Sequence, residues 1–277
     1  FAFKKGAVKE GTDILAGENE LYELPTEPFS GIEQLCWSPD SRFIAYSCRK
    51  LAGKKYAFST NTEIYIYNIE TAETSAIEMK GGYDTDPVWS PDGSKICWIS
   101  MERDGYEADK QRLMVADIEY ADGSMPIISD IKEITADFKY NVSGPVWSDD
   151  SHRIYFAALA EGIQGIFEAV AEGDGWKIDR LTGEDMWYDF GSPFHISVNE
   201  DGSRSLYTTW CSMDFPTELT VVDIKADGVR YTQITKENEH LLSQLADHKT
   251  EARYVKTVDG KDMLTWVLYP PQFDPSK

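Results

Sequence analysis

The acidic segment Met101–Lys110 holds the side chains best suited to bind a charged ligand. Carboxylates that converge on one point form a receptor for a positive group, and charge-assisted hydrogen bonds to an ammonium are stronger than neutral ones. The residues concerned are Glu102, Arg103, Asp104, Tyr106 and Glu107. The sequence therefore predicts a cation-binding loop, with a solvated loop of mixed charge as the alternative.

Motifs for catalysis or metal binding do not occur in the 277 residues. There is no Gly-x-Ser-x-Gly nucleophile motif, no glycine-rich phosphate loop and no His-Glu-x-x-His. The cysteines form no Cys-x-x-Cys pair and fall in predicted strands, which favours buried free thiols over a disulfide or metal site. These histidines and cysteines are His152, which is expected to be exposed, His195, His240, His248, Cys36, Cys48, Cys97 and Cys211. No catalytic residue, cofactor or metal is expected within this chain, and whether the chain alone is an enzyme stays open.

The chain is strongly acidic, with 48 Asp and Glu against 27 Lys and Arg and a net charge of −21. The negative electrostatic potential of such a chain disfavours binding to nucleic acid and attracts cationic groups, including the free ammonium of a peptide. A requirement for solubility alone also explains the acidic composition. No apolar run is long enough to span a membrane. No signal-peptide pattern follows Phe1, and we expect the sequence to begin inside a longer product.

A repeated sequence motif indicates the architecture that positions the Met101–Lys110 loop. Trp37-Ser38-Pro39-Asp40-Ser41 recurs as Trp89-Ser90-Pro91-Asp92-Gly93 and as Trp147-Ser148-Asp149-Asp150-Ser151, and a degenerate copy ends at Gly202. Repeats of about 40–50 residues that carry several short strands are typical of β-propellers. The sequence therefore predicts an all-β fold with about four four-stranded blades.

The repeated residues have structural explanations. Pro39 and Pro91 fit the second position of a tight turn, and Asp40 and Asp92 can accept hydrogen bonds from amides in that turn. Large rings before the turn can fill the space between adjacent blades. We therefore expect the three tryptophans to be buried core residues rather than ligand contacts; they are Trp37, Trp89 and Trp147.

Strand-like runs and turn signals divide the chain into successive segments. Residues 1–25 are expected to be the tail of a preceding blade, with strands at Thr12–Leu15 and Glu20–Glu23. A short helix and a hairpin around Asp259-Gly260 are expected at the end of the chain. The expected segments are 1–25, blades at 26–80, 81–136, 137–185 and 186–236, and a linker at 237–277.

Strand parity indicates which face carries function. In an antiparallel blade, the repeated short turns lie on one face, and the second-to-third loops lie on the other face with the crossovers between blades. Arg49–Thr62 and Met101–Lys110 are the long loops of that second face. Tyr with Asp or Asn recurs in the crossovers, which indicates a ligand contact or a hydrogen bond between blades: Tyr83-Asp84, Tyr140-Asn141 and Tyr188-Asp189.

Three longer stretches carry a family resemblance. Ser59–Asn68, Met101–Asp109 and Lys256–Asp274, the last with Pro270-Pro271, resemble the prolyl oligopeptidase family of serine peptidases. The likeness is to its branch of dipeptidyl-peptidase 5 and acylaminoacyl-peptidases, over roughly residues 10–277. The chain resembles the C-terminal part of that family's propeller together with the linker to its hydrolase domain.

The resemblance implies a propeller of seven or eight blades that caps a C-terminal α/β-hydrolase domain with a Ser-Asp-His triad. It implies a parent enzyme, periplasmic or secreted, that releases dipeptides or acyl-amino acids from peptides with a free N-terminus. No triad position lies in this sequence. The missing hydrolase domain and N-terminal blades would then be its partners, and a homodimer is compatible with this interpretation.

The propeller of such an enzyme would wall the active site, exclude folded proteins and hold the substrate's ammonium, for which Glu102 or Glu107 is the candidate. The alternative from another class is a non-catalytic TolB-like propeller that scaffolds protein–protein interaction. A self-contained four-bladed propeller is a third interpretation.

Overall fold

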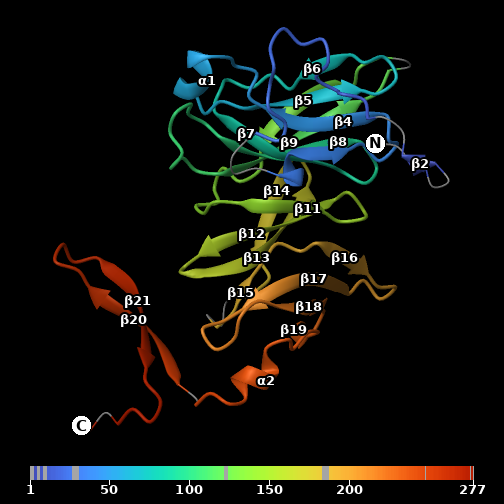
Figure 1. Ribbon diagram of the computed structural model, residues 1–277. Helices are drawn as coiled ribbons and strands as arrows, with labels where there is room; N and C mark the ends of the chain where they lie inside the picture. Colours follow the sequence, from blue (N-terminus) through green and yellow to red (C-terminus); the bar gives the residue numbers. More distant parts are fainter. Residues whose placement is uncertain are drawn as a thin grey trace. The chain divides into compact units, whose positions relative to one another are not determined.

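A computed structural model describes residues 11–26, 31–121, 124–182, 187–246, 248–274 and 276, and the backbone at 3–4 and 7–8. The chain divides into two compact units. The N-terminal unit comprises Phe1–Arg153 with Gly173–Trp176, and the C-terminal unit comprises Ile154–Glu172 with Lys177–Lys277. Both consist almost entirely of antiparallel strands, as predicted (Figure 1).

The N-terminal unit holds two four-stranded antiparallel sheets, drawn in blue to green in Figure 1. The first sheet has the order β3-β4-β5-β6 and the second β10-β9-β8-β7. Their strands are β3 (Leu35–Trp37), β4 (Phe43–Cys48), β5 (Glu63–Asn68), β6 (Thr74–Ala76), β7 (Tyr83–Trp89), β8 (Lys95–Met101), β9 (Arg112–Glu119) and β10 (Ile127–Glu133). The unit also contains β1 (Phe3–Lys4), β2 (Ala7–Val8), the 3-10 helix η1 (Ile32–Gln34), α1 (Lys54–Phe58) and β11 (Ser143–Trp147).

A third sheet has the order β11-β12-β13-β14, and a fourth sheet follows in the C-terminal unit. In the fourth sheet, β15 and β16 both pair with β17, which continues to β18 and β19. The remaining elements are β12 (Arg153–Ala160), β13 (Ile163–Glu172), β14 (Gly175–Arg180), β15 (Asp189–Phe190), β16 (His195–Val198), β17 (Arg204–Cys211), β18 (Glu218–Lys225), β19 (Gly228–Gln233), α2 (Glu239–Leu242), and the hairpin β20 (Lys249–Lys256) with β21 (Asp262–Tyr269).

The segment at 11–26 corrects one prediction. Thr12–Leu15 and Glu20–Glu23 are turn and coil rather than strands. Side chains from this segment, including Leu15 and Tyr22, pack against the Tyr46 and Tyr65 face of the first sheet. Since burial of these side chains against an existing sheet needs no strand partner, the apolar pattern there reflects packing rather than strand pairing.

The repeated turns share one hydrogen-bond pattern in the first three sheets, whereas in the fourth Asn199 N donates to Ser203 O, one residue nearer. In the first, Ser38 N donates to Phe43 O at 2.9 Å, and the Asp40 carboxylate accepts from Ser38 Oγ at 2.6 Å. The fifth residue of each copy has a left-handed backbone, which explains why glycine occupies it in two copies: Ser41, Gly93, Ser151 and Gly202. Each turn therefore closes with bonds made inside the motif itself.

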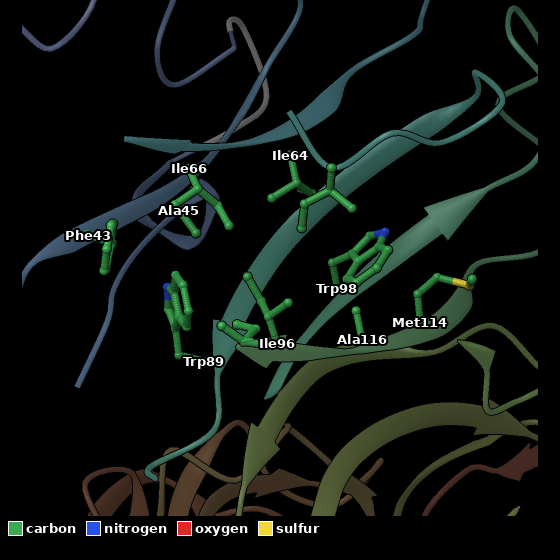
Figure 2. Close-up of a cluster of buried hydrophobic side chains, with 11 residues drawn as sticks. Phe43, Ala45, Ile64, Ile66, Trp89, Ile96, Trp98, Met114 and Ala116 are labelled. Atoms are coloured by element: carbon green, nitrogen blue, oxygen red, sulfur yellow. The ribbon is translucent and has the colours of Figure 1, made fainter. Parts of the chain in front are cut away.

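Two of the three motif tryptophans are buried, and one is not. Trp89 lies in the core cluster of the first and second sheets, which also contains Phe43 and Trp98, and its ring is next to Ile96 (Figure 2). Trp147 is 5% exposed, and its Nε1 donates to Val88 O at 3.0 Å. The prediction was wrong for Trp37, which is 58% exposed. Within the described residues no four-stranded sheet precedes β3, so Trp37 lacks the neighbour that covers the other two.

The crossover residues join neighbouring sheets, as one of the two interpretations predicted. The Asp84 carbonyl accepts hydrogen bonds from Ser47 Oγ and Thr62 Oγ1, both in the first sheet region, at 2.6 and 2.7 Å. Asn141 Oδ1 accepts from Gln111 N at 3.1 Å. In the C-terminal unit, Asp189 Oδ1 accepts from Gln164 N at 2.7 Å. The recurrent crossover residues therefore have a structural role, through the side chain at Asn141 and Asp189 and through the backbone carbonyl at Asp84.

The remaining expectations are met in part. All four cysteines are free; Cys48 and Cys97 are buried as predicted, whereas Cys36, in the outer strand β3, and Cys211, at the end of β17, are only partly buried. His152 is exposed, as expected. None of the helices in the described ranges has the length and apolar character that crossing a bilayer requires.

The two tryptophans in equivalent positions give a matched stability test. Trp89→Ala leaves a cavity in the core and should lower the free energy of unfolding by about 3–5 kcal/mol. Trp37→Ala should lower it by less than about 1 kcal/mol because that ring is mostly in solvent. Urea unfolding of both variants measures the difference. Equal losses would show that Trp37 is covered in solution.

Asp84 makes the stability of the N-terminal unit depend on pH. Its carboxylate is 1% exposed and accepts from Trp98 Nε1 at 3.1 Å, and burial raises its pKa to about 6. A pKa raised above the unfolded value of about 3.9 gives stability below pH 4 that is lost as the pH rises through about 6. Asp84→Asn should therefore be more stable than the natural protein at pH 8, by up to about 3 kcal/mol, and no more stable at pH 4.

A matched control for this test is Asp92→Asn in the turn before β8. Although burial opposes it, hydrogen bonds from Ser90 and Ser94 lower the pKa of Asp92, so its removal should reduce stability at neutral pH. Thermal unfolding between pH 4 and pH 8 compares the three proteins. A loss of stability at pH 8 in Asp84→Asn would contradict the role assigned to burial.

Candidate functional site

A pocket of about 850 Å³ opens in the N-terminal unit beside the predicted acidic loop. Its walls come from α1 and the residues after it, from the start of β7, and from the end of β8 with the following loop. The residues that line it are Thr26, Arg49, Tyr56, Ala57, Phe58, Ser59, Thr60, Tyr83, Met101, Arg103, Gly105, Tyr106 and Glu107. The two long loops and the Tyr83 crossover thus meet at one site, on the face that strand parity indicates.

Asp104 connects the two loops instead of facing the pocket. Its carboxylate accepts hydrogen bonds from Ser59 Oγ at 2.8 Å, Thr60 N at 2.7 Å and Asn61 N at 3.1 Å. The bond from Ser59, with those from Thr60 and Asn61, holds the pKa of Asp104 below its usual value. This carboxylate is fully engaged by its own protein.

Arg103 is also paired within the loop. Its guanidinium makes a two-point contact with Asp109, with Nε to Oδ2 at 3.1 Å and Nη2 to Oδ1 at 2.8 Å. It lies 4.0 Å from the centre of the Tyr106 ring, within the range of a cation–π contact. The bond to Arg103 lowers the pKa of Asp109 to about 2. The Arg103 charge is therefore balanced, and its plane supports Tyr106 at the pocket wall.

Arg49 places a second guanidinium on the pocket. It lies 4.6 Å from the centre of the Tyr56 ring, and its Nη1 donates to Tyr56 O at 3.5 Å. Its Nε is buried and has no hydrogen-bond partner in the described part of the chain. Tyr56 itself donates to Glu23 Oε2 at 2.7 Å. One wall of the pocket is therefore cationic and aromatic.

The two glutamates nominated from the sequence lie in different places. Glu102 is 73% exposed, 3.9 Å from Arg112 Nη1, and is not a pocket residue. Glu107 lines the pocket and makes no hydrogen bond or ion pair with any described residue. The pocket therefore combines one uncommitted carboxylate with two arginines and several aromatic rings. Such a surface can hold an ammonium group and an adjacent hydrogen-bond acceptor or apolar side chain.

The α1 side of this pocket was not predicted. The sequence indicates only a long loop at Arg49–Thr62, because the helix Lys54–Phe58 is too short to show helical periodicity. The available signal was Ser59-Thr60-Asn61, a run of residues that commonly bind backbone amides and carboxylates in turns. Together with the acidic residues of Met101–Lys110, this run is compatible with a contact between that loop and Arg49–Thr62.

The described residues show no alternative catalytic or metal centre. No group of three or more His, Cys, Asp and Glu among them could hold a metal ion. In the C-terminal unit a pocket of about 590 Å³ contains Ser212, Asp214 and His248, with His248 Nε2 3.2 Å from Asp214 Oδ1. Ser212 makes no hydrogen bond to His248, so these residues do not form a nucleophile with its base.

Comparisons with known proteins agree with the resemblance. The dipeptidyl-peptidase 5 of Porphyromonas gingivalis is 41% identical over 274 residues, which cover 98% of this chain and 37% of the relative. That of Porphyromonas endodontalis is 39% identical over 271 residues, covering 98% of this chain and 36% of the relative. The chain thus spans less than two fifths of the length of these relatives. No family model matches the chain.

A solved structure supports the fold. Oligopeptidase B from Trypanosoma brucei, in its closed form with covalently bound antipain, has a TM-score of 0.52 and 10% identity, over 88% of this chain and 32% of that one. Together with the antiparallel sheets, this likeness confirms the predicted class of β-propeller blades. Over 98% of its length, the chain is therefore similar to proteins named dipeptidyl-peptidase 5, as the sequence resemblance predicts.

Proposed function

We propose that this chain is the propeller region of a serine exopeptidase that releases dipeptides, or acyl-amino acids, from the N-termini of peptides. The support is the match of 98% of the chain to proteins named dipeptidyl-peptidase 5. Since those relatives are more than twice as long, the proposal assigns the Ser-Asp-His triad to polypeptide outside this sequence. In the parent, the blades would wall the active site and keep folded proteins out, and the parent would be periplasmic or secreted.

The finer proposal is that Glu107 holds the substrate's ammonium group. One observation carries it: of the acidic residues in the loop, Glu107 alone lines the pocket without a protein partner among the described residues. Asp104 and Asp109 are occupied by Ser59 and Arg103. A carboxylate that is free to accept from an ammonium gives a charge-assisted bond, which is stronger than a neutral one.

Holding the ammonium would determine which peptide bond is cleaved. A fixed N-terminus sets the distance, counted in residues, between the anchor and the carbonyl that meets the nucleophile. Fixing orientation in this way can lower a reaction barrier by several kcal/mol. The aromatic rings of Tyr56, Tyr83 and Tyr106 would then line the path of the first residues.

The test is Glu107→Gln in the complete polypeptide that carries this chain. Glutamine keeps the size and removes the charge, so KM for substrates with a free N-terminus should rise at least tenfold, while KM for N-blocked substrates should change less than twofold. Steady-state kinetics with a matched pair of chromogenic peptides measures both.

Glu102→Gln is the matched control, since Glu102 has the same charge in the same loop but lies off the pocket and is 73% exposed. It should leave both KM values within twofold. An equal loss on free and blocked substrates in Glu107→Gln would contradict the anchor. A complete polypeptide without a serine nucleophile would contradict the peptidase itself and favour a scaffold.

A further inference from the structure

One carboxylate joins the two walls of the pocket across a long sequence interval. Asp104, in the loop after β8, accepts from Thr60 N and Thr60 Oγ1, which lie 44 residues earlier in the chain. Ser59 Oγ donates to its other oxygen, and Asn61 N also reaches Oδ1. Four donors from three successive residues therefore surround a single side chain.

The connection is reciprocal. Gly105 N donates to Thr60 Oγ1 at 2.8 Å, so the residue after Asp104 returns a bond to the same threonine. Ser59 Oγ also accepts from Asn61 N at 3.1 Å, which fixes the turn that presents these donors. We call the set Ser59, Thr60, Asn61, Asp104 and Gly105 the loop clasp.

The loop clasp stands directly beside residues that line the pocket. On one side, Tyr56 and Phe58 of α1 lead into Ser59. On the other side, Tyr106 and Glu107 follow Gly105. The bridge between Thr62 and Tyr83 joins the bases of these walls, and the loop clasp adds the hydrogen bonds that hold the two loops together farther out.

We infer that Asp104 is a positioning residue: through the loop clasp it fixes the distance between the α1 wall and the Glu107 wall of the pocket. The inference rests on the proposed use of this pocket for substrate binding. Asp104 acts by hydrogen bonding rather than by its charge, because its oxygens are already occupied by the protein's own donors. It therefore shapes the site without contacting the ligand.

The geometry separates this role from a direct electrostatic one. In Asp104→Asn, the amide oxygen can still accept from Thr60 and Asn61, and the amide nitrogen can donate to Ser59 Oγ. In Asp104→Ala, every bond to the side chain is lost. A positioning role therefore predicts rescue by asparagine, whereas a charge role predicts that asparagine and alanine are equally defective.

The experiment compares Asp104→Ala and Asp104→Asn in the complete polypeptide with free and N-blocked substrates. Asp104→Ala should raise KM at least fivefold for both substrates, since both must fit between the walls, and should leave kcat within twofold. Asp104→Asn should stay within twofold in both constants. Equal defects in the two variants, or no effect of alanine, would overturn the inference.

Hydrogen exchange provides a readout that does not need activity. Asp104→Ala should accelerate exchange at the amides of Thr60, Asn61 and Gly105 at least threefold, and Asp104→Asn should largely restore protection. Unchanged exchange in Asp104→Ala would overturn the clasp. If the natural polypeptide lacks peptidase activity, the proposed function fails, while this exchange comparison still tests the inference by itself.

Discussion

The packing of the first sheet against the second is the contact on which the candidate site depends. Trp89, Trp98 and Phe43 fill the space between these sheets (Figure 2). Burial of such rings is the largest favourable contribution that a small interface between sheets can have. The pocket takes one wall from each sheet's loops, so its shape is preserved only while this core holds the sheets in register.

The crossovers between sheets determine how the first sheet is aligned with the second. Burial of apolar surface is not directional, whereas the bonds from Ser47 and Thr62 to the Asp84 carbonyl specify one alignment. Asp84 bears a cost for this place, since its carboxylate is removed from water. The bonds that join the sheets use the backbone carbonyl of Asp84, so the cost of burying its carboxylate is separate from them.

Much of the fold follows from local sequence pattern, whereas the partners of individual side chains do not. The repeated turns, the strand-like run Glu63–Asn68 and the Asp259-Gly260 hairpin are local signals, and all three appear in the structure. Trp37 carries the same motif as Trp89 but is exposed, because burial depends on which sheet lies alongside. Sequence pattern cannot supply that neighbour.

In the candidate site, too, local sequence pattern predicts where the loop lies but not the partners of its side chains. The sequence places Glu102, Asp104 and Glu107 in one loop and on one face, and the structure brings this loop to a pocket. The sequence does not reveal that the Asp104 carboxylate is bound by Ser59–Asn61, since the contact between Asp104 and Thr60 spans 44 residues. In a chain with a net charge of −21, acidic clusters are therefore poor guides to free carboxylates, and the pocket has mixed charge.

The self-contained turns have a consequence for the order of assembly. Each closes its bonds over a few residues, as when Ser38 bonds with Phe43, so the entropy lost in forming it is small. The contacts between Asp104 and Thr60 must close a loop of 44 residues and bring a larger loss. During folding, each hairpin should consequently form early and independently of the others. The mouth of the pocket should be among the last parts of the N-terminal unit to become ordered.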